Sequence, residues 1–248
     1  MSGQALPIPL MAHRGYAEAY PENTLAAISA AGDAGIDLIE FDIQLSRDGV
    51  PVLMHDNSLK RTANSKLLVT ETDSTDLALI EANYADGFGS VHSGNVIPTL
   101  EAALTLLEKN CDWTYFIELK RESIDVFGAE YVVEKLLPLI YDYLPRCVLI
   151  SFEYECLEEV CRRSDVHVGW VLREYSEQSH GQALALDPDY LLINHRRLPR
   201  RDVALWEGDW QWVSYEVTDA PHARELRDRG IDIISSMAAP QLAAELSQ

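Results

Sequence analysis

The sequence has few cysteines, no long apolar run and no excess of basic residues. Its four cysteines are scattered, and Cys156 and Cys161 have the wrong spacing for a zinc knuckle, so we expect reduced, buried structural thiols. No stretch approaches the roughly 20 consecutive apolar residues of a membrane-spanning helix. Residues 1–8 lack the basic start and apolar core of a secretory signal. These absences predict a cytoplasmic protein without stable membrane association.

The deficit of basic residues also restricts the possible partners. The chain has 20 lysines and arginines against 40 aspartates and glutamates, which gives a formal net charge of −20. Such a surface repels nucleic-acid phosphates and anionic membranes. We therefore expect a small-molecule substrate and no nucleic acid. If that substrate is an anion, a bound divalent cation and a few arginines must reverse the field locally.

What the chain does have is an almost regular alternation of strand-like and helix-like runs. Strands are predicted at residues 9–12, 36–45, 113–119, 147–152, 166–172, 190–194, 211–217 and 231–235. Helices are predicted at residues 25–34, 98–109, 126–143, 155–163, 178–185, 202–206, 218–229 and 240–246. Eight such units in a chain of 248 residues are typical of a (β/α)8 TIM barrel. An open doubly wound sheet is the alternative fold.

One stretch, residues 38–56, adds a hairpin to this alternation and contains the first candidate site. Two apolar runs flank Asp48-Gly49, and Asp-Gly is the strongest hairpin signal that a sequence offers. Folding the chain about these two residues places His55 opposite Asp42. Because strand side chains alternate between faces, Glu40 and Asp42 point the same way. Two ionised carboxylates this close need a cation between them, so we predict a metal site with an acid–base histidine beside it.

The segment after the hairpin, residues 57–97, is polar and irregular. We interpret it as a small insertion over the barrel mouth, because it is too short and too polar for a hydrophobic core of its own. No linker or repeat divides the chain, so residues 1–248 are predicted to form a single catalytic barrel domain.

Several polar residues follow the predicted strands at the end where the active sites of TIM barrels lie. His13 and Arg14 follow the first strand. Glu118 and Lys120 end the third barrel strand, and the two-residue period of a strand puts them on the same face. The convergence of independent segments on one barrel mouth strengthens the prediction of a site there.

Other strand-end residues are weaker candidates. Phe152 ends the fourth strand and Tyr215 lies in the seventh, where both are candidates to line a substrate pocket. His195-Arg196-Arg197 follows the sixth strand and is interpreted as a surface basic cluster, with contact to the phosphate as the alternative. Glu22-Asn23-Thr24 is interpreted as structural: it begins a helix with Asn23 or Thr24 as the N-cap, or alternatively it helps to orient His13. Asp56 is expected to orient a neighbour or to cap its loop.

Several of these residues belong to short motifs with a distinctive order and spacing. The motifs are His13-Arg14-Gly15, Pro21-Glu22-Asn23-Thr24, Glu40-x-Asp42, Asp48-Gly49, His55-Asp56, Pro98-Thr99-Leu100-Glu101 and Glu118-Leu119-Lys120. Over residues 12–120 this pattern resembles the glycerophosphodiester phosphodiesterase family, and the resemblance is looser over residues 147–236. There, Tyr215-Glu216-Val217-Thr218 replaces the family's Trp-Thr-Val-Asn, and the Thr-Asp expected at the end of the last strand is missing. Both departures concern the pocket for the substrate's alcohol.

The resemblance implies metal-dependent hydrolysis of a glycerophosphodiester to sn-glycerol 3-phosphate and an alcohol. It assigns a divalent cation, Mg2+ or Ca2+, to three carboxylates, which are Glu40, Asp42 and Glu118. Carboxylate oxygens suit these hard cations, and the lack of clustered Cys and His ligands argues against zinc. Arg14 and Lys120 would bind the phosphate. His13 and His55 would act as general acid and general base, in an order that the sequence leaves open.

Three other functions are weighed against the same residues. A phospholipase D-type lysophospholipid hydrolase or lyase would use the same metal and histidines, but it should have an apolar entrance, of which residues 57–97 give little sign. A non-catalytic barrel that binds phosphodiesters would not need two titrating imidazoles. A metal-dependent isomerase on the same fold is the most distant alternative.

Overall fold

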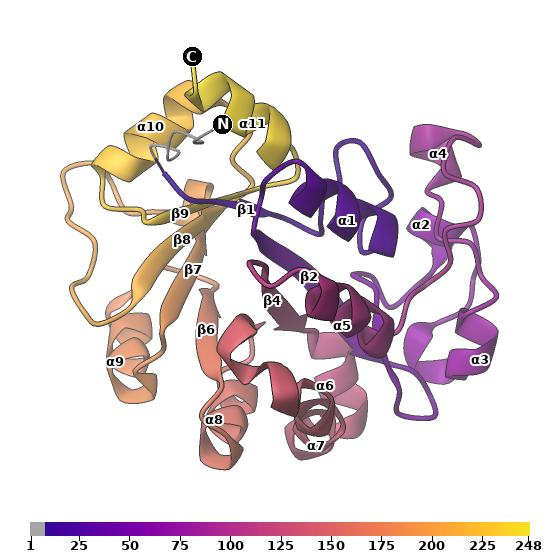
Figure 1. Ribbon diagram of the computed structural model, residues 1–248. Coiled ribbons are helices and arrows are strands. Elements are labelled where there is room, and N and C mark those ends of the chain that lie inside the picture. Colours follow the sequence, from indigo (N-terminus) through magenta and orange to yellow (C-terminus); the bar gives the residue numbers. More distant parts are fainter. Residues whose placement is uncertain (1–7) are drawn as a thin grey trace.

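The described part of the chain is built around a closed ring of parallel strands (Figure 1). The structure is a computed structural model that describes residues 8–248. Residues 1–7 lie outside the described residues. The prediction that residues 1–8 lack a secretory signal falls almost entirely on them. Within the described part, the sheet has nine strands: β1 (Leu10–Ala12), β2 (Leu38–Leu45), β3 (Pro51–Leu53), β4 (Thr114–Leu119), β5 (Cys147–Ser151), β6 (His167–Leu172), β7 (Tyr190–Asn194), β8 (Gln211–Tyr215) and β9 (Ile233–Ser236).

The strand order confirms the predicted barrel. Neighbours are hydrogen-bonded in the order β1-β9-β8-β7-β6-β5-β4-β2-β3, and β1 also pairs with β2, which closes the ring. Pairing around the ring is parallel, whereas β3 is added antiparallel to β2 as a hairpin return. The fold is therefore a (β/α)8 TIM barrel with a hairpin and an insertion after its second strand, and the doubly wound alternative is wrong.

Helices surround the ring on the outside (Figure 1). The main helices are α1 (Leu25–Asp33), α5 (Leu100–Lys109), α6 (Arg121–Phe127), α7 (Ala129–Ile140), α8 (Tyr154–Arg163), α9 (Glu177–Leu186), α10 (Ala220–Asp228) and α11 (Ala239–Leu246). Shorter helical turns are α2 (Lys60–Ala63), α3 (Ser74–Leu77), α4 (Ala85–Phe88), η1 (Val69–Glu71), η2 (Tyr141–Arg146) and η3 (His195–Arg197). Among the described helices, none is long and apolar enough to cross a membrane.

The alternation of side chains along the strands creates two hydrophobic layers. Ile39, Phe41 and Ile43 of β2 belong to the large layer that packs against the helices. A second cluster fills the inside of the barrel with Met11, Phe116, Val148, Ile150, Val171, Leu192, Val213 and Ile233. This inner cluster closes the barrel and leaves the polar residues of β2 and β4 at the open end.

The hairpin has a different register from the predicted one. β2 and β3 pair Leu45 with Pro51, and the Met54 amide donates to the Asp42 carbonyl at 3.1 Å. Met54, not His55, therefore lies opposite Asp42. The prediction failed because residues 46–50 form a longer loop instead of a two-residue turn at Asp48-Gly49. The Ser46 amide donates to the Val50 carbonyl at 3.0 Å, which closes this loop.

The expectation that residues 57–97 lack a hydrophobic core is also wrong. Their apolar side chains join two from the hairpin return in a small buried cluster: Val52, Met54, Leu59, Val69, Leu77, Ala82 and Ile97. The segment with α2, α3 and α4 lies to the side of the ring (Figure 1). No described side chain of residues 57–97 lines the central cavity. The insertion borders the barrel mouth and does not fill it.

Three smaller expectations need correction. The helix predicted at 126–143 is broken at Gly128, whose φ of 82° is a conformation that glycine adopts without strain. Residues 202–206 are not helical, and Trp206 at the end of this segment stacks on Tyr175 and His180 with ring centroids 4.0 Å and 4.7 Å apart. Cys156 is buried as expected, but Cys161 is exposed.

Candidate active site

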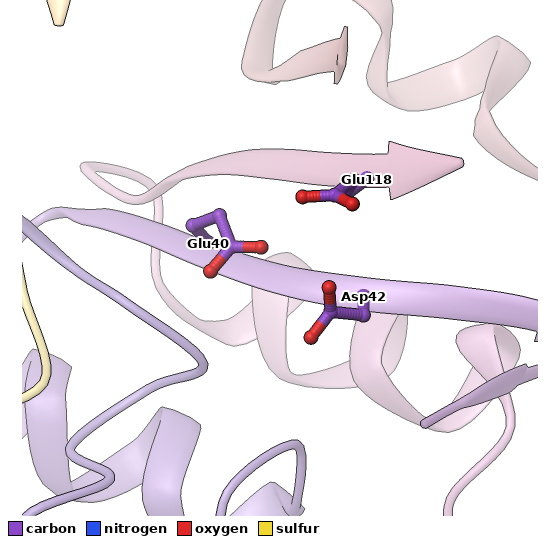
Figure 2. A group of neighbouring side chains, drawn as sticks. All are labelled: Glu40, Asp42 and Glu118. Carbon is purple, nitrogen blue, oxygen red and sulfur yellow. The ribbon is translucent and has the colours of Figure 1, made fainter. Parts of the chain in front are cut away.

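Three carboxylates from two neighbouring strands lie together at the open end of the barrel (Figure 2). Glu40 and Asp42 occupy alternate positions of β2, and the parallel register places Glu118 of β4 beside Asp42. One oxygen from each carboxylate lies within 4.8 Å of the other two. The exposed fractions of Glu40, Asp42 and Glu118 are only 3%, 1% and 8%. The structure thus brings the predicted ligand set together in a buried position.

The electrostatics of this cluster favour a bound cation. Burial raises the pKa of Glu40 well above its usual value, and the charges of Asp42 and Glu118 act in the same direction. Burial, followed by the charge of Asp42, also raises the pKa of Glu118. In addition, Glu40 Oε1 is buried and has no hydrogen-bond partner among the described residues. A divalent cation fits here, since it would relieve the repulsion and provide the missing partner.

Two cationic side chains are in contact with the carboxylates and also line the central cavity. Arg14 Nε lies 3.3 Å from Asp42 Oδ2, and Lys120 Nζ lies 2.8 Å from Glu118 Oε1 and 3.3 Å from Asp42 Oδ1. Burial opposes ionisation of Asp42, but the charges of Lys120 and Arg14 outweigh it and lower the pKa of that carboxyl. Asp42 therefore stays ionised, with Arg14 and Lys120 as its cationic neighbours.

Asn23 positions Asp42, which the sequence did not indicate. Its side-chain amide donates to Asp42 Oδ2 and accepts from the Asp42 backbone amide, both at 2.9 Å. Thr24, the other predicted candidate, is the N-cap of α1 and accepts from the Ala27 amide at 3.2 Å. The segment that precedes α1 therefore both begins the helix and holds a candidate metal ligand.

Gly15 allows the chain to leave β1 next to the candidate site. Its φ is +73°, and a Cβ there would lie 2.6 Å from the carbonyl carbon of Ala27. Gly35 has a similar φ of +83°, but a Cβ on Gly35 would meet nothing within 4 Å.

We expect Gly15→Ala to destabilise the protein more than Gly35→Ala. Both variants incur the cost of a left-handed alanine, about 1–2 kcal/mol, and only Gly15→Ala adds a backbone clash. Urea denaturation of the two variants measures the difference in the free energy of unfolding. Equal losses would contradict the close approach of Gly15 to α1.

The two predicted histidines line the same cavity. His13 is 9% exposed, and its Nε2 lies 3.8 Å from Glu40 Oε2. Burial lowers the pKa of His13 to about 3, and the neighbouring Arg14 acts in the same direction. His55 is held differently, because its Nδ1 lies 2.6 Å from Asp56 Oδ1. That contact leaves Nε2 as the free nitrogen of the His55 ring.

The cavity has a volume of about 300 Å3 and extends from the carboxylates to the ends of β5–β8. Phe152 and Tyr215 line it, as the sequence predicted. Arg197 lines it too, and it is also exposed, as expected for a surface basic cluster. Arg173 was missed, and its guanidinium carbon lies 5.0 Å from the centre of the Phe152 ring. Applying the strand-end rule to the fifth predicted strand, which ends at Leu172, would have found Arg173.

Comparison with known proteins identifies the family. Residues 13–159 match a family model that is described as "Glycerophosphoryl diester phosphodiesterase family". The chain is a member of that family. Within it, the Bacillus subtilis protein YhdW is 37% identical over 228 residues, which are 90% of this chain and 91% of that protein. The glycerophosphodiester phosphodiesterase of Caldanaerobacter subterraneus is 34% identical over 153 residues, 61% of this chain.

Not all of these matches extend over whole proteins. The chain spans 60% of the length of the Caldanaerobacter relative and 63% of the length of the Bacillus subtilis protein YqiK. Among solved structures, a phosphodiesterase from Oleispira antarctica in complex with the product sn-glycerol-3-phosphate is similar, with a TM-score of 0.85 over 98% of both chains. At 24% sequence identity, this similarity establishes the barrel fold.

Proposed function

We propose that this member of the family hydrolyses glycerophosphodiesters to sn-glycerol 3-phosphate and an alcohol in a metal-dependent reaction. The observation that carries the proposal is that two of the three clustered carboxylates, two cationic side chains and two histidines line one cavity. Family membership supports the substrate class. The complex of the Oleispira phosphodiesterase with sn-glycerol-3-phosphate supports the assignment of the product.

The charge balance of the site supports a divalent cation. The contacts around the cavity join five carboxylates: Glu22, Glu40, Asp42, Asp56 and Glu118. They join three permanently cationic side chains: Arg14, Arg61 and Lys120. With all five carboxylates ionised, this described network has two negative charges in excess, which Mg2+ or Ca2+ would neutralise. A cation held by Glu40, Asp42 and Glu118 would offset the charge that develops on the phosphate oxygens.

The remaining steps are assigned to the chain's own residues. Arg14 presents a planar guanidinium and Lys120 a point charge to a phosphate in the cavity. His13 and His55 share the proton transfers: one takes the proton of the attacking oxygen, and the other protonates the departing alkoxide. The attacking oxygen belongs either to water or to the glycerol moiety of the substrate itself. Asp56 holds the His55 ring through Nδ1 during this exchange.

The charged part of the cavity lining favours a small polar substrate over a lysophospholipid. Charged side chains, namely Arg173, Arg197 and Glu216, line the cavity beside Phe152 and Tyr215. An acyl chain would need an apolar surface in their place. We also infer that the barrel and the insertion act as one catalytic domain, because Arg61 of the insertion contacts Glu22 and Asp56 at the barrel mouth.

The identity of the products tests the proposed function. The purified protein should convert glycerophosphocholine with Mg2+ or Ca2+ into equal amounts of sn-glycerol 3-phosphate and choline. Phosphocholine and glycerol as the products would mean that the other phosphoester bond is cleaved. That outcome, or no hydrolysis of glycerophosphocholine, glycerophosphoethanolamine and glycerophosphoglycerol with either metal, would contradict the proposal.

A further inference from the structure

Arg61, on α2 of the insertion, connects two carboxylates that lie behind the cavity wall. Its Nη1 and Nη2 donate to the two oxygens of Glu22 at 2.7 Å and 2.8 Å. Its Nε and Nη2 donate to the two oxygens of Asp56 at 2.7 Å and 3.1 Å. One planar guanidinium thus forms a forked pair with each carboxylate, and the four hydrogen bonds use four of the five N–H donors of arginine.

Each of these carboxylates also contacts a side chain that lines the cavity. Glu22 Oε1 accepts from Arg14 Nη1 at 2.9 Å, and Asp56 Oδ1 lies 2.6 Å from His55 Nδ1. Arg14 and His55 line the cavity, whereas Glu22, Arg61 and Asp56 do not. Arg61 is therefore one step removed from both the candidate phosphate ligand and the candidate acid–base group.

We propose that Arg61 is a positioning residue that fixes His55 in its Nδ1–H tautomer through Asp56 and holds Arg14 in place through Glu22. Its effect on catalysis rests on the proposed function, but its effect on the His55 tautomer does not. Burial opposes ionisation of Asp56, but the hydrogen bonds from Arg61 and His55 outweigh it and lower the pKa of Asp56 to about 2. Asp56 is thus an ionised acceptor for Nδ1–H, so that in the neutral ring Nε2 is the nitrogen without a proton.

The position of Arg61 gives the insertion a role in the candidate site. Arg61 lies two positions after Leu59, a fully buried member of the insertion's hydrophobic cluster. Its guanidinium carbon lies 6.0 Å from the centre of the Tyr84 ring, also in the insertion. The small core of residues 57–97 thereby fixes the direction from which Arg61 reaches Asp56. Without Arg61, the Asp56 side chain, 30% exposed, is free to turn toward water.

The decisive experiment compares the His55 tautomer in the wild type and in Arg61→Ala by 15N NMR of the imidazole nitrogens. A His55→Gln spectrum identifies the His55 signals. We expect the Nδ1–H form in the wild type and a mixture containing the Nε2–H form in Arg61→Ala. Arg47→Ala is the matched control, because Arg47 forms a forked pair with Asp73 of the insertion, at 2.8 Å for Nε, but does not line the cavity. It should leave the His55 signals unchanged.

Activity gives the second readout. We expect Arg61→Ala to lower kcat/KM for glycerophosphocholine about 10- to 100-fold, as is usual for residues that orient a functional side chain, and Arg47→Ala to change it less than about twofold. Arg61 and Asp56 line a surface cavity of about 380 Å3, so that free guanidinium can reach the position that the variant vacates. Guanidinium below denaturing concentrations should restore part of the lost rate, and the same concentration of sodium chloride should not.

The outcomes separate this inference from the proposed function. If the wild type hydrolyses no glycerophosphodiester, the proposed function is wrong, and the NMR comparison still decides the role of Arg61. An unchanged His55 tautomer in folded Arg61→Ala would overturn the inference. A loss of rate that guanidinium does not restore would also overturn it, since Arg61 would then act through overall stability.

Discussion

His55→Ala is expected to lower kcat for glycerophosphodiester hydrolysis by about 10²- to 10⁴-fold, which is the usual contribution of a general acid or base. His55 lines the cavity, and Asp56 holds its Nδ1, so the variant removes a proton donor or acceptor that no other described side chain replaces in this position. Steady-state release of sn-glycerol 3-phosphate at saturating metal measures the loss.

The chain contains a matched control for this variant. His167 Nδ1 lies 2.6 Å from Asp189 Oδ1, the same distance as in the pair of His55 and Asp56, but His167 is at the start of β6 and away from the cavity. We expect His167→Ala to keep kcat within about twofold. If His55→Ala also keeps kcat within a few-fold, the assignment of His55 to proton transfer is wrong.

Glu118→Gln is expected to lower kcat/KM by about 10³-fold or more. A cation contributes several kcal/mol of transition-state stabilisation, and each 1.4 kcal/mol corresponds to about a factor of ten. The substitution removes one of the three carboxylates that lie within 4.8 Å of one another. It also removes repulsion from the metal-free cluster, so the metal-free variant should unfold at a temperature no lower than that of the metal-free wild type.

Thermal unfolding with and without Mg2+ or Ca2+ distinguishes loss of the cation from loss of the fold. The wild type should gain stability from the cation, because only the folded state assembles the three ligands. Glu118→Gln should gain much less. Glu216→Gln, which changes another carboxylate of the same cavity, should gain as much as the wild type. If Glu118→Gln gains as much as the wild type, the cation binds elsewhere.

Much of the barrel could be predicted from the sequence because its signals are local. The strand at Tyr190–Asn194 has the predicted bounds, and the helix that begins after Thr99 ends at Lys109 as expected. The predicted register of the hairpin was wrong, because a change of one residue in loop length shifts every pair of the hairpin. Extending the turn to residues 46–50 shifts the partner of Asp42 by one position, and the Asp-Gly signal does not reveal loop length.

The residues of the candidate site that lie on strands could be predicted from the sequence. Because parallel strands end together, their terminal residues meet, and this places Glu118 beside Asp42. Arg61 could not be found in this way, since it lies in a segment without periodicity. Its contact with Glu22, 39 positions away in the chain, forms only in the tertiary structure. Asn23 was missed for a different reason, because its motif also has the form of an ordinary helix start.

Removing and restoring the divalent cation tests the central claim most directly. The rate of sn-glycerol 3-phosphate release from glycerophosphocholine is measured on the same preparation before chelation, after chelation and after addition of excess Mg2+ or Ca2+. We predict that chelation abolishes the release and that one of the two cations restores it in the wild type but not in Glu118→Gln. Release that continues undiminished after complete removal of the metal would contradict a cation site at Glu40, Asp42 and Glu118.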